Sequence, residues 1–265
     1  MITTNILYSG SEGNATIISD GNTDIIIDAG GTEKRLLEAL KGIGKDLSTV
    51  KAIFITHEHG DHTKAIYTLS KKYSVPIYTS IGTAKSICSK KDVCIETRKC
   101  VAKHIRTIEA NNTYEIDSLL VTPFQIPHDV EAHGFKIEFE DGKNLTYATD
   151  TGCVTREMLT NFEGTDIAVI ESNHDRDMLI NGNYAEFLKQ RILSDYGHLS
   201  NEVASRFALW LSQRGTKHIF LAHLSKDNNT PTIAKSVTRE RLDDNGFSDV
   251  ELIIADRYES VGLTL

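Results

Sequence analysis

Three histidines and two carboxylates stand within six consecutive residues in the first quarter of the chain. The run HEHGDH covers residues 57–62 and follows VKAIFIT, a short apolar run typical of a buried strand. Imidazole and carboxylate groups are ligands of zinc, manganese and iron. His57 and His59 can converge on one ion from an extended loop, whereas Asp61 and His62, at the entry to the next helix, suit a second ion. A solvated polar loop is the alternative, but three histidines in this spacing argue against it.

Other strand-like runs end in further candidate ligands. His128 follows VTPFQIP, Asp150 ends NLTYATD, and His223 ends HIFLAH. Each alone is equally typical of a capping or solvated residue at a strand end. Together with the histidine run they supply the ligands that a two-ion site needs, and two ions can stabilise both the attacking and the leaving oxygen of a displacement. Asp28, at the end of the strand-like part of TDIIIDAG, is expected to orient the histidine run through hydrogen bonds.

Two more residues lie where they could move a proton. Glu171 comes at the end of the strand-like run IAVIE, and His198 lies in DYGHLSNEVA, just before an expected helix. A helix start alone explains GHLSN, because serine and asparagine are preferred caps. The functional alternative is a hydrogen-bonded pair beside the metals, in which Glu171 orients His198 and makes it a competent general acid.

The elements that must position these residues alternate along the chain. Strand-like runs open it, a β-rich stretch covers about residues 114–149, and strands alternate with helices in the last third. This pattern predicts a mixed α/β protein with helices outside two packed sheets, with its chemistry in loops at strand ends. The 265 residues contain no linker and no tandem repeat, so we expect a single domain over 1–265.

Composition narrows the class of protein. The net charge of −8 argues against a simple basic nucleic-acid-binding module, but it does not exclude an enzyme that acts on nucleic acid. No apolar run approaches the roughly 20 residues that span a bilayer, and MITTNILYSGSEGN does not resemble a signal peptide. The four cysteines form no C-x-x-C pair and are expected to be reduced thiols. We therefore expect a cytoplasmic protein without a membrane partner.

The runs TDIIIDAG, THEHGDH, IPHD, YATDTG and LAHLS resemble, in order, the five motifs of the metallo-β-lactamase superfamily. The resemblance covers nearly the whole chain. It implies a four-layer αββα sandwich with a dinuclear metal site at one edge. It also implies how the ligands divide: His57, His59 and His128 for the first metal, Asp61, His62 and His223 for the second, and Asp150 as the bridge.

Further runs resemble the YycJ/WalJ-like family within that superfamily: SGSEGNATII, ESNHD, MLINGNY, LKQRILSDYGHLSN and LAHLSKDNNTP. Its members are cytoplasmic and are regarded as DNA exonucleases or related phosphodiesterases. Glu171 and His198 are similar to residues of the phosphodiesterase branch that assist the leaving group and contact the phosphate. This chain departs from the family at Glu12, where a small residue is common, and in the cysteine-rich run SICSKKDVCIETRKCVAKHIR, which leaves substrate preference open.

The segment from Lys85 to Arg106 is basic, with seven lysines and arginines against two acidic residues. A solvated face is one interpretation of such a run. The other is a wall that contacts the phosphates of a nucleic acid, for which Lys90, Lys91, Arg98 and Lys99 are the candidates.

The sequence leads to the hypothesis of a binuclear metal-dependent phosphodiesterase, a DNA exonuclease that uses a metal-bridging hydroxide, with Asp61, His198 and Glu171 as catalytic residues. The two divalent transition-metal ions suit zinc, and manganese or iron also fit. The alternatives are a thioesterase or lactonase on the same fold, an oxidoreductase of the flavodiiron kind, and a non-catalytic metal-binding regulator. The flavodiiron class usually has glutamate in place of the second histidine, whereas His59 is present here. Strand polarity, DNA against RNA, exonuclease against endonuclease action and oligomeric state stay open.

Overall fold

The first seven-stranded sheet is built from both ends of the chain, in the order β14-β1-β2-β3-β4-β5-β6. The strands from β14 to β3 pair antiparallel, and those from β3 to β6 pair parallel. The carboxyl ends of β3 and β4 therefore meet at one edge, just before Asp28 and the histidine run. The strands are β1 Thr3–Tyr8, β2 Ala15–Ser19, β3 Asp24–Ile27, β4 Val50–Phe54, β5 Ile77–Thr79, β6 Ile105–Thr107 and β14 Val261–Thr264.

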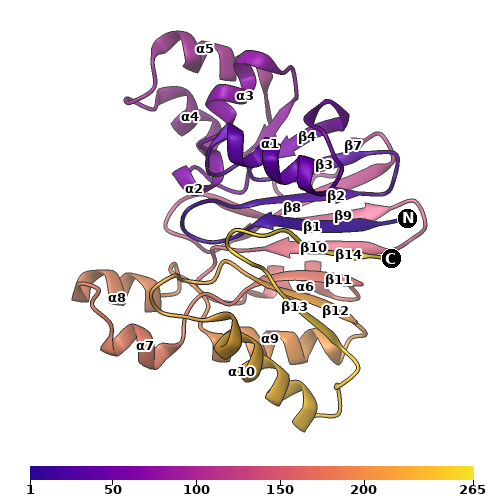
Figure 1. The fold of residues 1–265 in the computed structure, drawn as a ribbon, viewed down its shortest axis with the longest axis vertical. Coiled ribbons are helices and arrows are strands. Elements are labelled where there is room, and N and C mark those ends of the chain that lie inside the picture. Colours follow the sequence, from indigo (N-terminus) through magenta and orange to yellow (C-terminus); the bar gives the residue numbers. More distant parts are fainter. The chain divides into compact units, whose positions relative to one another are not determined.

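Helices cover this sheet with their apolar faces. In α1, Leu36 and Leu40 are buried one turn apart, and the side chain of Thr32 caps the helix by accepting from the amide of Arg35. These leucines share one core with Ile26 and Ile53 of the strands. The helices are α1 Glu33–Gly42, α2 Gly60–Thr63, α3 Ile66–Lys72, α4 Ile81–Ser89 and α5 Ile95–His104, with a 3₁₀ turn, η1, at Leu47–Thr49 (Figure 1).

The second seven-stranded sheet has the order β13-β12-β11-β10-β9-β8-β7. Its strands β10 to β13 run parallel, while β9 pairs antiparallel with β10. Asp150, Glu171 and His223 stand at the carboxyl ends of three neighbouring parallel strands, where functional residues of α/β sheets gather. The strands are β7 Tyr114–Ile116, β8 Leu119–Ile126, β9 Ala132–Phe139, β10 Asn144–Ala148, β11 Ile167–Glu171, β12 His218–Ala222 and β13 Glu251–Ile254.

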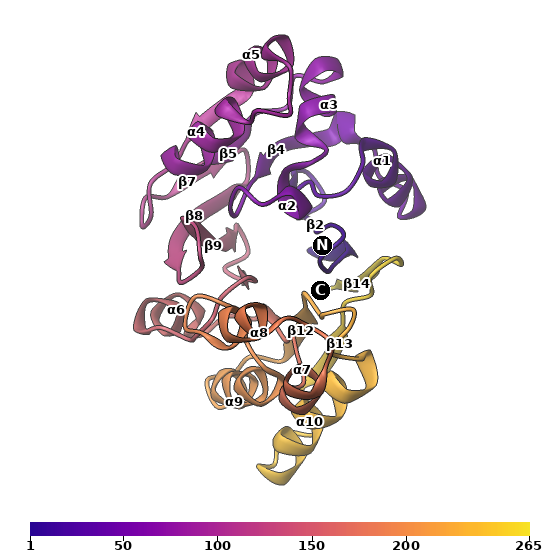
Figure 2. The same ribbon diagram turned by 90° about the vertical axis from the view of Figure 1, so that its left-hand side faces the viewer.

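The helices of the second half connect its parallel strands. The longest two, α9 and α10, lie side by side, as both views of the ribbon show (Figures 1 and 2). The Ser200 side chain caps α9 by accepting a hydrogen bond from the amide of Val203, and Pro231 starts α10. The helices are α6 Arg156–Phe162, α7 Arg176–Asn181, α8 Glu186–Leu193, α9 Asn201–Ser212 and α10 Pro231–Asp244.

This computed structural model describes all residues 1–265 and divides them into two compact units. Unit 1 holds residues 1–123, 130–133 and 257–265, and unit 2 holds 124–129 and 134–256. The predicted mixed α/β class is confirmed, because the chain forms two seven-stranded sheets that are accompanied by helices. Two features were not predicted from the sequence: the helices α4 and α5 in the basic segment, and the strand β14. No helix has the length and apolar character needed to cross a membrane.

Candidate metal and catalytic residues

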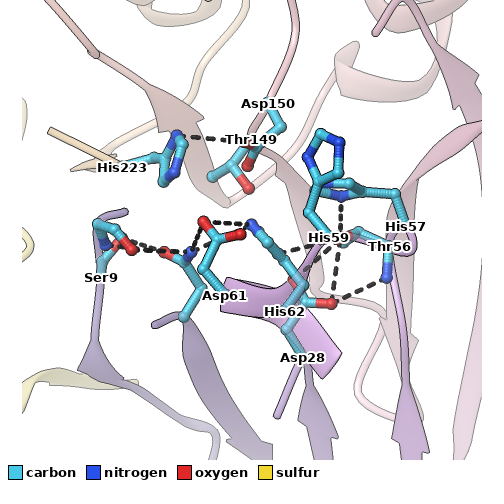
Figure 3. A network of polar contacts seen from close by, with 12 residues as sticks. Ser9, Asp28, Thr56, His57, His59, Asp61, His62, Thr149, Asp150 and His223 are labelled. Atoms are coloured by element: carbon cyan, nitrogen blue, oxygen red, sulfur yellow. Dashed lines mark hydrogen bonds and ion pairs between the residues drawn. The ribbon is translucent and has the colours of Figure 1, made fainter. Parts of the chain in front are cut away.

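The loop between β4 and α2 brings two imidazoles together in unit 1. His57 Nε2 lies 3.0 Å from His59 Nδ1, and the His57 ring is fully buried (Figure 3). Two nitrogen ligands on one tetrahedral zinc, each at 2.0–2.1 Å, stand about 3.3 Å apart. The two nitrogens therefore have a spacing that suits a shared ion, and the binding of an ion by His57 and His59 stays a prediction.

A buried carboxylate, that of Asp28, holds the histidine loop in place. Asp28 Oδ2 lies 2.7 Å from His62 Nδ1, and its Oδ1 accepts from the Thr56 amide at 2.9 Å. The Thr56 hydroxyl also contacts His57 Nδ1 at 2.9 Å. Burial raises the pKa of Asp28, and the neighbouring His62 partly offsets that rise. With its Nδ1 held by Asp28, His62 presents Nε2 to Asp61 Oδ2, 3.5 Å away, so these two groups can also ligate one cation.

Asn14 is a residue of this loop region that the sequence analysis did not single out. Its side-chain amide nitrogen lies 3.1 Å from His62 Nε2 and 3.5 Å from Asp61 Oδ2. Its oxygen accepts from the Gly10 amide at 2.8 Å, which fixes the buried side chain. A Cβ at Gly30 would lie 1.7 Å from the Asp61 carbonyl oxygen, so only glycine allows this approach. The run SGSEGN was the signal available in the sequence, since asparagine beside glycine marks a tight turn.

Unit 2 gathers the second set of candidates around one carboxylate. Glu171 Oε1 lies 2.9 Å from His198 Nδ1 and 2.7 Å from His223 Nδ1. Its Oε2 accepts from the backbone amides of Thr151, at 3.2 Å, and Leu199, at 2.9 Å. Burial alone would raise the pKa of Glu171, but the two imidazoles together lower it well below its usual range. The ionised carboxylate therefore orients two histidines, whereas the sequence analysis expected it to orient only His198.

Asp150 completes this group. Its Oδ1 lies 3.4 Å from His223 Nδ1 and 3.8 Å from His198 Nδ1. Asp150, Glu171, His198 and His223 offer ligand atoms within 4.8 Å of one another, a donor set of the kind that binds divalent transition metals. Because Glu171 engages the Nδ1 atoms of both histidines, the Nε2 atoms are the ring nitrogens that face away from it.

His128 belongs to the same unit and comes from the loop after β8. Its ring centre lies 5.4 Å from that of His198, and its Nε2 lies 3.2 Å from Asp129 Oδ1. Burial lowers the pKa of His128, which favours the neutral imidazole that ligates a metal. The Pro127 carbonyl accepts from the Gly152 amide at 3.1 Å and so ties this loop to the one that carries Asp150.

Three of the predicted site residues have a strained backbone. Asp28, Asp150 and His223 have φ angles of 61°, 59° and 55°, in the left-handed region that residues other than glycine rarely adopt. Such residues cost on the order of 1–3 kcal/mol each and concentrate at functional sites. Asp28 and His223 directly follow a strand of a parallel pair, and Asp150 lies two residues after one, so each sharp turn redirects a side chain at a strand end.

The four candidate phosphate contacts lie on and between α4 and α5. Lys91 and Lys99 are exposed, whereas Lys90 and Arg98 are half-buried. The Lys90 ammonium stands 5.7 Å from the centre of the Tyr67 ring. The first pair is thus open to a ligand, and the second pair is partly engaged with the protein.

Comparisons with known proteins show the family of the chain. The model of a β-lactamase superfamily domain matches residues 23–224. Exodeoxyribonuclease WalJ of Streptococcus pneumoniae is 36% identical over 229 residues, which cover 86% of this chain and 84% of that protein. Exodeoxyribonuclease YycJ of Bacillus anthracis is 33% identical over 242 residues, covering 91% and 89%.

The fold has a counterpart among solved structures. The metallo-β-lactamase fold protein YhfI of Bacillus subtilis aligns with a TM-score of 0.72 over 99% of both chains, at 17% identity. This alignment confirms the predicted fold. The chain therefore belongs to the metallo-β-lactamase superfamily of metal-dependent hydrolases and, within it, to the family of the WalJ and YycJ exodeoxyribonucleases.

Proposed function

We propose that this enzyme is a DNA exonuclease that depends on two divalent transition-metal ions. The observation that carries the proposal is the Glu171–His198 pair, with its 2.9 Å contact beside Asp150 and His223. A carboxylate-held imidazole next to metal-binding groups provides a proton donor, which the alkoxide leaving group of a phosphodiester needs. The names of the two exodeoxyribonuclease relatives support DNA as the substrate.

The proposed metal ligands are seven. His57, His59 and His128 would hold one ion, Asp61, His62 and His223 the other, and Asp150 would be shared. The spacing of His57 and His59 and of Asp61 and His62 supports this division within unit 1. Bound divalent ions would lower the pKa of water and neutralise charge on a phosphate. Zinc suits the imidazole ligands, and manganese or iron suits the carboxylates as well.

The chain's own residues would bind the substrate and move the proton. His198 Nε2 would protonate the leaving oxygen while Glu171 holds Nδ1 and stabilises the imidazolium form. The Asp61 carboxylate would orient the attacking water by accepting a hydrogen bond from it. Asn14, whose amide lies 3.1 Å from His62 Nε2, would donate to a phosphate oxygen.

The basic segment would guide the DNA backbone. Its exposed Lys91 and Lys99, supported by half-buried Lys90 and Arg98, would contact phosphates in spite of the net charge of −8. We further propose that the chain acts as a single metallo-β-lactamase-fold domain in the cytoplasm, with nucleic acid as its partner and no membrane partner.

The test is the digestion of end-labelled single- and double-stranded DNA and RNA by protein freed of metal and then reloaded with zinc, manganese or iron. The proposal predicts release of mononucleotides from DNA ends that requires metal and is lost in His198→Ala. Thioester or lactone substrates, tested in parallel, should react far more slowly. If reloaded protein hydrolyses a thioester or lactone but leaves every DNA intact, the nuclease assignment is wrong. If it binds metal and hydrolyses none of these substrates, a regulator is the better account.

A further inference from the structure

A cavity of about 480 Å³ opens between α1 and the segment that leads into β14. We call it the α1 pocket; its lining includes Arg35, Glu38, Gly42 and Ile43 on one side and Tyr258 and Glu259 on the other. All of these residues belong to unit 1. The volume lies in the range of about 300–1,000 Å³ that is typical of small-ligand sites. None of the proposed catalytic residues lines it.

An arginine held between two tyrosines forms one wall. Arg35 Cζ lies 4.0 Å from the centre of the Tyr8 ring and 5.8 Å from that of Tyr258. Its Nη2 donates to the Arg257 carbonyl at 2.5 Å, and the buried Tyr8 hydroxyl donates to the Gly30 carbonyl at 2.7 Å. The guanidinium is therefore fixed in place. Tyr258, in contrast, is 65% exposed, a large aromatic surface at the pocket that the fold itself does not cover.

The charges around the pocket select against a phosphate. Glu38 and Glu259 line it together with Arg35, and Glu12 Oε2 lies 3.3 Å from the Tyr258 hydroxyl, so carboxylates outnumber the guanidinium at the pocket. An anion would be repelled. A flat aromatic group that carries amino donors would instead stack on the tyrosine ring and donate hydrogen bonds to the carboxylates. Nucleobases with an exocyclic amino group have this chemistry.

The pocket wall is continuous with the loop that reaches the histidine run. Glu12 and Asn14 lie on the same turn, and a Cβ built on Gly13 would come within 3.3 Å of Arg35 Nη1. Asn14 contacts both Asp61 and His62. One short turn thus links the pocket to residues of the proposed active site. This turn also carries Glu12, whose carboxylate lies beside the Tyr258 hydroxyl.

We propose that the α1 pocket binds one nucleobase of the DNA strand, stacked on Tyr258, with its amino group directed to the surrounding carboxylates. The proposal rests on the proposed function for the identity of the substrate. It adds a base-contacting subsite, and it makes binding sensitive to an abasic position at one place in the strand.

Four variants test the pocket. Tyr258→Ala removes the stacking surface, and Tyr258→Phe keeps it. Gly42→Trp fills the cavity, and Gly42→Ala is its matched control. A Cβ at Gly42 meets no atom within 4 Å, and this last residue of α1 has no positive φ, so both changes are compatible with the fold.

The readout is binding by metal-free protein. Single-stranded oligonucleotides carry 2-aminopurine at successive positions, and 2-aminopurine deoxynucleotide serves as the minimal probe. Wild-type protein should quench the fluorescence at one position. Tyr258→Ala should weaken binding by about 5- to 150-fold, the range for loss of one base–aromatic stack. Gly42→Trp should weaken it similarly, whereas Tyr258→Phe and Gly42→Ala should bind as the wild type does. Inorganic phosphate should not compete.

Equal affinities in wild type, Tyr258→Ala and Gly42→Trp would overturn the proposal, as would binding that an abasic nucleotide leaves unchanged at every position. Competition by inorganic phosphate would overturn it too, since the pocket would then be an anion site. Digestion of labelled DNA by metal-loaded wild type separates the two proposals. If that digestion fails, the nuclease function falls, and the mononucleotide probe still tests the pocket.

Discussion

The two units assemble their candidate residues in different ways. In unit 1 a single loop after β4 presents His57, His59, Asp61 and His62 within six residues. In unit 2 the candidates come from four separate loops and from the end of β11, and Asp150, Glu171 and His223 meet only because β10, β11 and β12 are neighbours in a parallel sheet. The first set depends on local chain geometry and the second on sheet topology.

The two sets share one kind of carboxylate–imidazole contact and differ in how many imidazoles the carboxylate contacts. In both, a buried carboxylate holds the Nδ1 of a proposed ligand, Asp28 for His62 at 2.7 Å and Glu171 for His223 at 2.7 Å. Glu171 also holds His198, which is no proposed ligand, whereas Asp28 holds no such extra imidazole. The difference fits the proposal that both units contribute metal ligands and that unit 2 supplies the proton donor.

The largest effect should come from removing His198. His198→Ala should lower kcat on DNA by about 10²–10⁴-fold, the usual contribution of a general acid, and leave metal content unchanged. The loss should shrink for a nitrophenyl phosphodiester, whose leaving group needs little protonation. His218→Ala is the matched control, because His218 Nδ1 also pairs with a glutamate, Glu251, at 2.9 Å. His218 begins β12, whereas the candidate residue His223 follows the other end of that strand. Loss of metal in His198→Ala would make this residue a ligand and remove its separate role.

A buried histidine without a partner should make unit 2 sensitive to acid. His174 is 1% exposed, its ring nitrogens have no hydrogen-bond partner, and burial lowers its pKa to about 4. Between pH 6.5 and pH 4 the unfolded chain binds a proton here that the folded chain does not. As the pH falls from 6.5 to 4, the free energy of unfolding should therefore decrease, by about 3 kcal/mol in total.

The measurement is denaturant unfolding of metal-free protein across that window, for wild type and His174→Leu. The difference between the two stabilities should change in favour of the variant as the pH falls, and it should be constant above pH 6.5, where both states hold a neutral imidazole. If the free energies of unfolding of wild type and His174→Leu change in parallel with pH, His174 titrates alike in the folded and unfolded chain, and the prediction is wrong.

The two carboxylates should separate metal binding from catalysis. Asp28→Asn and Glu171→Gln should each weaken metal affinity by about 10- to 100-fold, since each removes a partner that orients a ligand. Only Glu171→Gln should also lower kcat when metal is saturating, because it releases His198. The check is metal titration followed by turnover at saturating metal. Equal kcat values for the two variants would contradict the assignment of proton transfer to unit 2.

The smallest effect is expected on the basic segment. Lys91→Glu with Lys99→Glu should weaken binding of long DNA a few-fold and lower the slope of log K against log salt by about 2. Lys235→Glu, an exposed lysine on α10, is the control for charge alone. An unchanged salt slope would leave the segment as a solvated face.

Part of the fold and the site follows from sequence pattern. The histidine run is contiguous, and the apolar runs before Asp150, Glu171 and His223 place these residues at strand ends, but the parallel pairing that brings them to one edge came only from the structure. Asn14 was missed because its contact with Asp61 and His62 depends on packing between distant loops that only Gly30 permits. The second histidine on Glu171 was missed for a similar reason, since nothing local relates His223 to it.

The pairing of the two ends of the chain was harder to predict from the sequence. β14 is four residues long and partly exposed, so its pattern is weak, and its pairing with β1 is a contact between the termini. The α1 pocket depends on this pairing, because it brings Tyr258 to Arg35.

The short helices α4 and α5 were also hard to predict. They lack a continuous apolar face, with Ile81 and Ile95 exposed at their first positions.

The most direct test of the account is the metal content of Asp61→Ala, His223→Ala and the double variant, measured by elemental analysis beside their turnover. Wild type should hold about two ions per chain. Each single variant should keep one ion and lose activity, and the double variant should still keep one, because Asp61 and His223 are proposed to ligate the same ion. Loss of both ions in the double variant, or full activity of Asp61→Ala with one ion, would contradict the account.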